Sequence, residues 1–227
     1  MVKPTEHATV ANAPWSRERL KDALRLYLVT DQPSLKGRML IDVVQAAVQG
    51  GVTCVQLREK RANSRDFYAL AVALMDLLRP LNVPLIINDR LDIALACGAH
   101  GVHLGQSDLP VHAARKLLPP EVFIGWSVET LEEVALSAAL PVDYLGVSPV
   151  FATPTKTDTA TPWGLEGLQR VRALTPLPLV AIGGIHLHNA TQVMQAGADS
   201  LAVVSAICSA DDPCAASQQL RELIDAH

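Results

Sequence analysis

The chain has 227 residues, of which 49% are hydrophobic, so it can bury one sizeable core as a single domain. Its net charge of −4 argues against a protein that coats nucleic acid or an anionic membrane surface. No stretch approaches the roughly 18 consecutive apolar residues that cross a bilayer, and the scattered cysteines form no C-x-x-C pair. These features predict a cytoplasmic protein, and they leave a homo-oligomer open.

Short apolar runs alternate with longer amphipathic segments, which is the pattern of parallel strands joined by helices. The expected strands are Leu24–Thr30, Cys54–Leu57, Leu85–Asn88, Gly101–Leu104, Val122–Gly125, Tyr144–Val147, Leu179–Ile182 and Ser200–Val204. The clearest helical periods cover Gly37–Gln49, Ser64–Leu78, Glu129–Ala139 and Leu187–Ala196. Eight such units predict an α/β fold, a closed (β/α)8 TIM barrel.

The barrel domain is expected over residues 23–227, after an N-terminal extension of residues 1–22. A short helical pattern covers Trp15–Leu26. It either plugs the bottom of the barrel or forms a mobile arm, and it has no expected catalytic role.

The second expected strand ends in the sequence Gln56-Leu57-Arg58-Glu59-Lys60. Alternation along the strand sends Gln56, Arg58 and Lys60 to one side. Two cations facing one point suit a diphosphate, because Arg offers a planar donor fork and Lys a compact charge. A solvated strand end with ion pairs among Arg58, Glu59 and Lys60 explains the same residues equally well.

Carboxylates follow the next two strands, in Asn88-Asp89 and at Asp108. Adjacent strands bring these loops together, so Asp89 and Asp108 can share one Mg²⁺ that takes its other ligands from water and substrate phosphates. Taken singly, each aspartate is better explained as the N-cap of the next helix. Ser127, after the fifth strand, is likewise either a ligand donor or a cap. The histidines, His103 among them, have no metal-ligand spacing and receive no role.

Three further loops suit phosphate. The segment Thr153-Pro154-Thr155-Lys156 lies in a polar loop that can clasp phosphate oxygens and close over the barrel mouth, or be an ordinary surface loop. Gly183-Gly184 and Val204-Ser205 follow the last two strands, whose loops hold phosphate in many barrels. Glycine lets backbone N–H groups approach an anion, so these loops predict a phosphorylated ligand.

Taken in order, these motifs resemble those of the thiamine-phosphate synthase family, from about residue 26 to residue 226. The motifs are Gln56–Lys60, Asn88-Asp89, His103–Asp108, Thr153–Lys156, Ile182–Ile185 and Val204-Ser205. The resemblance implies a transferase that joins hydroxymethylpyrimidine diphosphate to thiazole phosphate, or to its carboxylated form, giving thiamine phosphate and diphosphate. It also implies one Mg²⁺ per active site and a pyrimidine cation formed by loss of diphosphate.

The same resemblance assigns roles to residues of this chain. It implies that the pyrimidine diphosphate is bound by Gln56, Leu57, Arg58, Glu59, Lys60, Asn88, Ser127 and Lys156, with Mg²⁺ held by Asp89 and Asp108. It implies that the thiazole phosphate is bound by Thr153, Pro154, Thr155, Gly184, Val204 and Ser205. Arg58, Ser127 and Lys156 are the expected catalytic residues. Two departures are Lys156-Thr157-Asp158, where many relatives carry a second Lys, and Val128-Glu129 in place of Ala-His.

Two alternatives share the barrel. A thiazole tautomerase of the same family transfers a proton and needs neither diphosphate nor metal. A non-catalytic barrel that binds thiazole phosphate would keep only the phosphate end. The set of Asp89, Asp108 and the cations Arg58, Lys60 and Lys156 favours the synthase.

Overall fold

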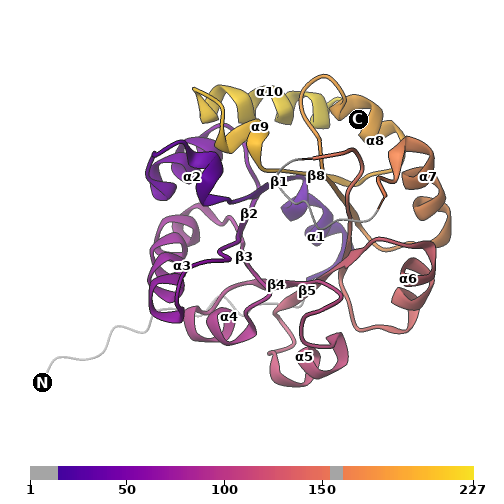
Figure 1. Ribbon diagram of the computed structural model, residues 1–227, viewed down its shortest axis with the longest axis horizontal. Coiled ribbons are helices and arrows are strands. Elements are labelled where there is room, and N and C mark those ends of the chain that lie inside the picture. The colour runs from indigo at the N-terminus through magenta and orange to yellow at the C-terminus, as the bar shows by residue number, and fades with distance from the viewer. Residues whose placement is uncertain (1–14, 154–160) are drawn as a thin grey trace, which may run out of the picture.

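The computed structural model describes residues 15–153 and 161–227. Eight parallel strands close into one barrel in chain order. They are β1 (Leu26–Val29), β2 (Cys54–Leu57), β3 (Leu85–Asn88), β4 (Gly101–Leu104), β5 (Phe123–Val128), β6 (Tyr144–Val147), β7 (Leu179–Ile182) and β8 (Ser200–Val203). The predicted (β/α)8 barrel is confirmed, and helices surround the strands (Figure 1).

Most of the helices cover the outside of the barrel, and four of the α-helices begin at a side-chain cap. Asn63 caps α3, Asp212 caps α10, and Thr130 forms a capping box with Glu133 on α6. The α-helices are α1 (Arg17–Leu24), α2 (Leu40–Gln49), α3 (Ser64–Leu78), α4 (Leu91–Cys97), α5 (Val111–Leu117), α6 (Leu131–Leu136), α7 (Gly164–Leu174), α8 (Ala190–Gln195), α9 (Ser205–Cys208) and α10 (Pro213–Asp225). Short 3-10 turns are η1 (Gln32–Leu35), η2 (Arg79–Leu81) and η3 (Ser137–Ala139). No helix among the described residues is long and apolar enough to cross a membrane.

The predicted bounds of the fifth strand, Val122–Gly125, are wrong. The strand β5 continues to Val128, because its last residues pair with β6 and the capping box delays α6 until Leu131. Ser127 therefore lies within a strand, opposite Gly146, and not in a loop after it. The first strand was also predicted too long, since Leu24 ends α1.

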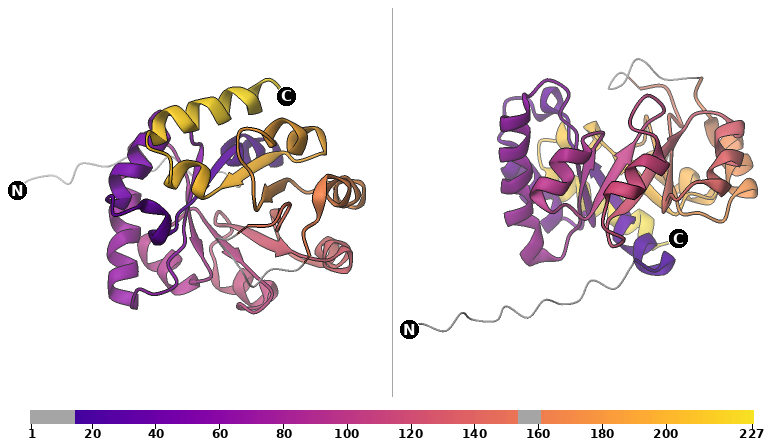
Figure 2. Two further views of the ribbon diagram at one scale, coloured as in Figure 1. Left: turned by 45° about the horizontal axis from the view of Figure 1, so that its top comes forward. Right: turned by 90° about the horizontal axis from the view of Figure 1, so that it is seen from below.

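The core has two layers. The larger one fills the space between the strands and the surrounding helices, and the smaller one fills the barrel interior. Leu20 and Leu24 of α1 belong to the interior layer, and Trp15 packs against it. The helix α1 lies across one end of the barrel (Figures 1 and 2). Of the two alternatives for this segment, the structure shows the plug.

Candidate active site

A cavity of about 640 Å³ opens at the carboxyl ends of the strands, and all eight strands or the loops after them contribute to its lining. Nearly all of the described residues that the sequence nominated line it; the exceptions are Leu57 and Glu59. Leu57 is buried in the outer core, and the Glu59 carboxylate accepts a hydrogen bond from the backbone of Arg61. Pro154, Thr155 and Lys156 lie outside the described residues.

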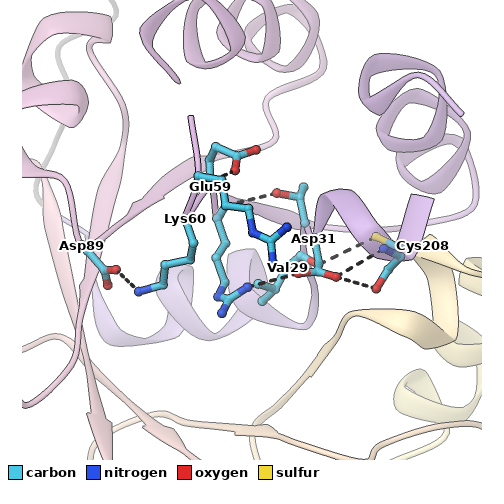
Figure 3. A network of polar contacts seen from close by, with 10 residues as sticks. Val29, Asp31, Glu59, Lys60, Asp89 and Cys208 are labelled. Carbon is cyan, nitrogen blue, oxygen red and sulfur yellow. Dashed lines mark hydrogen bonds and ion pairs between the residues drawn. The ribbon is translucent and has the colours of Figure 1, made fainter. Parts of the chain in front are cut away.

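The cations after β2 pair with acids on neighbouring loops. Arg58 Nη1 lies 3.2 Å from Asp31 Oδ1, after β1, and Lys60 Nζ lies 2.5 Å from Asp89 Oδ2, after β3. Figure 3 shows Lys60 directed at Asp89, with Asp31 on the other side of Lys60. Asp31 is itself fixed, because its Oδ2 accepts the hydroxyl hydrogen of Ser34 at 2.7 Å. The alternative raised by the sequence was a strand end with ion pairs among Arg58, Glu59 and Lys60. The structure instead pairs both cations with acids on other loops.

Asp89 and Asp108 stand together at the cavity wall, and neither is a helix cap. Arg90 is the N-cap residue of α4 and Pro110 that of α5. Asp108 Oδ2 instead accepts the backbone N–H of Gly105 at 2.6 Å. Burial raises the pKa of Asp108, and the adjacent Asp89 carboxyl raises it further. Two mutually repelling carboxylates in a partly buried wall are a site that a cation would stabilise.

The floor of the cavity is a chain of hydrogen bonds inside the barrel. Gln56 Nε2 donates to Tyr27 Oη at 2.6 Å, and Tyr27 Oη lies 3.0 Å from Tyr144 Oη. The ring of His103 joins Tyr144 Oη through Nδ1 at 2.9 Å and Ser127 Oγ through Nε2 at 2.9 Å. Thr130, not Ser127, caps α6.

His103 was given no role from the sequence, but it lies at the centre of the floor. Alternation along β4 was the available signal, because it places His103 two residues after Gly101 on the inward face. Its partners on β5 and β6 are distant in sequence, so spacing alone could not identify them.

The opposite wall is made by the loops after β7 and β8. Gly184 has φ +63°, and a Cβ there would lie 2.8 Å from the carbonyl oxygen of Ala152, so only glycine fits without a shift. The backbone of Phe151 donates to the carbonyl of Gly183 at 3.0 Å, which ties this loop to the one after β6. Val204 and Ser205 complete this wall.

The fold and the site define a (β/α)8-barrel enzyme with its active site at the carboxyl ends of the strands, where barrel enzymes carry their chemistry. Charged side chains form one wall of its cavity and glycine backbone the other.

Comparison with known proteins identifies the family. The sequence model for thiamine monophosphate synthase matches residues 26–207. A thiamine-phosphate synthase of Albidiferax ferrireducens is 74% identical over 90% of this chain and 93% of its own length. One of Vibrio campbellii is 52% identical over 89% and 99%. The chain belongs to the thiamine monophosphate synthase family, which confirms the predicted family and its transferase class.

Solved structures agree. Thiamine phosphate pyrophosphorylase from Pyrococcus furiosus superimposes with a TM-score of 0.84 at 36% identity, covering 91% of this chain and 98% of that one. A 3-hexulose-6-phosphate synthase from Salmonella typhimurium has a TM-score of 0.70 at 17% identity, covering 89% and 99%. The second likeness shows the shared barrel fold alone.

Proposed function

We propose that the chain joins hydroxymethylpyrimidine diphosphate to thiazole phosphate, giving thiamine phosphate and diphosphate. The observation that carries this is a single cavity with two unlike walls. Arg58, Lys60 and the Asp89–Asp108 pair suit a metal-bound diphosphate, and the Gly183-Gly184 backbone across the barrel suits a monophosphate. A tautomerase transfers a proton and needs neither diphosphate nor metal, so the cations and the carboxylate pair of the first wall favour the synthase.

Asp89 and Asp108 fit one Mg²⁺. Their carboxylate oxygens are hard ligands, and burial together with mutual repulsion raises the pKa of Asp108 in the absence of a cation. No group of three or more His, Cys, Asp or Glu that could hold a metal occurs within residues 15–153 and 161–227, so water and substrate phosphate would supply the remaining ligands. When bound, Mg²⁺ supplies positive charge that neutralises the diphosphate.

The reaction breaks one bond and forms another. The C–O bond of the pyrimidine methylene breaks, diphosphate leaves with the electron pair, and the thiazole nitrogen then forms a C–N bond to that carbon. Negative charge grows on the departing oxygen, so Arg58 and Lys60 stabilise the transition state more than the ground state. Lys156, which the family resemblance assigns to the same diphosphate, would add a third cation.

The remaining assignments concern orientation. Gln56, Asn88 and Ser127 hold the pyrimidine diphosphate, with Leu57 and Glu59 adding only backbone groups. The thiazole phosphate is bound by Gly184, Val204, Ser205 and the segment Thr153-Pro154-Thr155. Enclosing both substrates orients the nitrogen toward the methylene and keeps water from the cation.

The remaining proposals concern location and partners. We propose a cytoplasmic enzyme on the basis of its scattered free cysteines. We propose small-molecule substrates and no nucleic-acid partner, which the net charge of −4 supports.

The test mixes the purified protein with both substrates and Mg²⁺ and follows thiamine phosphate and diphosphate together. Metal-dependent, equimolar formation of the two products, abolished by EDTA, is expected. Arg58→Ala should lose most of this activity, whereas Arg65→Ala, an exposed arginine on α3, should retain it. Binding of thiazole phosphate without product formation would contradict the proposal.

A further inference from the structure

The hydrogen bonds of the cavity floor have a direction that can be derived from their chemistry. Gln56 Nε2 can only donate, so Tyr27 Oη accepts at its 2.6 Å contact. The single hydrogen of Tyr27 then goes to Tyr144 Oη, its other partner among the described residues, at 3.0 Å. The hydrogen of Tyr144 in turn goes to His103 Nδ1 at 2.9 Å.

The direction fixes the tautomer of His103. A nitrogen that accepts a hydrogen bond carries a lone pair, so the ring hydrogen of the neutral imidazole is on Nε2. That hydrogen is donated to Ser127 Oγ at 2.9 Å. His103 is the hydrogen-bond partner of the Ser127 hydroxyl within the described part of the chain, so the hydrogen of that hydroxyl is available to a ligand in the cavity.

Both phenols keep the hydrogens that this direction requires. Burial, together with neighbouring groups, raises the pKa of Tyr27 and that of Tyr144 well above the usual range. Each therefore remains a neutral hydroxyl with one hydrogen to donate near neutral pH.

Glycines on other strands hold the rings of His103 and Tyr144 in place. A Cβ at Gly146 would lie 2.8 Å from His103 Cε1, and a Cβ at Gly125 would overlap the ring of Tyr144. The two rings lie 5.6 Å apart, tilted by 34°. Each ring thus fills a space that a larger residue in place of the glycine would occupy. The contacts of the floor are therefore held by packing as well as by hydrogen bonds.

We infer that Tyr27, Tyr144 and His103 are positioning residues, which carry one direction of hydrogen bonding from Gln56 to Ser127 so that the floor offers an acceptor at Gln56 Oε1 and a donor at Ser127 Oγ. This inference rests on the proposed function for its ligand. An aminopyrimidine matches the pattern, because its amino group donates and its ring nitrogens accept. An oxo group in place of the amino group would meet the acceptor of Gln56 with a second acceptor.

The direct test is the tautomer of His103 in the ¹⁵N NMR spectrum of the free protein, with the signals assigned by their loss in His103→Asn. Hydrogen on Nε2 is expected in the wild type. Tyr144→Phe removes the donor to Nδ1 and should give a mixture of tautomers. Tyr68→Phe is the matched control, because Tyr68 is exposed on α3, and it should keep the wild-type tautomer. Hydrogen on Nδ1 in the wild type would overturn the inference.

The kinetic test separates positioning from folding. Tyr144→Phe is expected to raise KM for the pyrimidine diphosphate about tenfold, which is the effect of one misdirected hydrogen bond, and to leave KM for thiazole phosphate unchanged. Its preference for the amino over the oxo substrate should fall by a similar factor. Tyr27→Phe breaks the chain one link earlier and provides a second variant. Equal changes in both KM values, or an unchanged preference in both variants, would contradict the inference.

Failure of the two proposals can be told apart, because the tautomer is measured without turnover. Hydrogen on Nε2 in a protein that makes no thiamine phosphate would support the direction of the floor and overturn only the proposed reaction. Normal turnover with hydrogen on Nδ1 would do the reverse.

Discussion

The two ends of the barrel are built with the same device and serve different purposes. At the amino end the ring of Phe123 lies over Gly101 and meets Trp15 edge-on, with ring centroids 5.2 Å apart. At the carboxyl end the ring of His103 lies over Gly146. In both, a ring from one strand fills the space left by a glycine on another strand. An apolar ring there closes the core, whereas a polar ring directs hydrogen bonds into a cavity, so stability and chemistry are separated along the barrel axis.

A cavity in the core at the amino end should cost the most stability and leave the activity at the carboxyl end unchanged. Leu24 is fully buried in the barrel interior, so Leu24→Ala loses its burial and leaves a cavity. We expect the free energy of unfolding to fall by about 2–5 kcal/mol, with kcat/KM unchanged at low temperature. Denaturant unfolding measures the first quantity. Leu117→Ala, at a leucine that is 61% exposed, is the control and should change little. A loss of activity at full folding would show that the plug reaches the active site.

A substitution at the carboxyl end should have the opposite effect, changing activity and leaving stability nearly unchanged. Asp89→Asn keeps the side-chain size and suits φ +62°, because Asn adopts the left-handed region readily. It removes one of the two proposed metal carboxylates, so we expect the Mg²⁺ concentration for half-maximal activity to rise by roughly a hundredfold, with stability nearly unchanged. A Mg²⁺ titration of activity measures this, with Asp92→Asn on the exposed start of α4 as control. An unchanged titration would remove Asp89 from the ligand set.

A smaller effect on activity is expected at Asp31, which contacts Arg58 and acts on the substrate only through it. Asp31 holds the guanidinium of Arg58 at 3.2 Å and has a side chain only 14% exposed. Asp31→Asn keeps an oxygen for the cap of η1 but removes the charge that positions Arg58. We expect KM for the pyrimidine diphosphate to rise severalfold, up to about tenfold, while KM for thiazole phosphate stays constant. Substrate titrations of both test this, and equal changes in both would indicate a general disturbance of the barrel.

Much of this molecule follows from local sequence, and the exceptions share one cause. Strand β2 lies at its predicted bounds, because its apolar run ends abruptly in charge. The site motifs follow the strands and meet at one end by the rule of parallel barrels. The role of His103 was missed, because it depends on Ser127 and Tyr144, which are 24 and 41 residues away. The end of β5 was missed for the same reason, since pairing with β6 overrides local pattern.

The smallest expected effect concerns a histidine at the amino end. His100 precedes β4, and its Nδ1 accepts the backbone N–H of Leu85 at 3.1 Å. Burial lowers the pKa of His100 in the folded protein, and the charges of Arg79 and Arg19 lower it further.

The sign of the pH dependence follows from this shift. Below a pH of about 6.5 the unfolded chain binds a proton at His100 that the folded chain does not, so the free energy of unfolding falls as pH decreases through this range. His100→Asn can offer an amide oxygen to Leu85 without titrating. We therefore expect a shallower decline in stability for the variant between about pH 7 and pH 5, measured by urea unfolding at each pH. Parallel curves for the two proteins would mean that the titration of His100 contributes nothing to the loss of stability in acid.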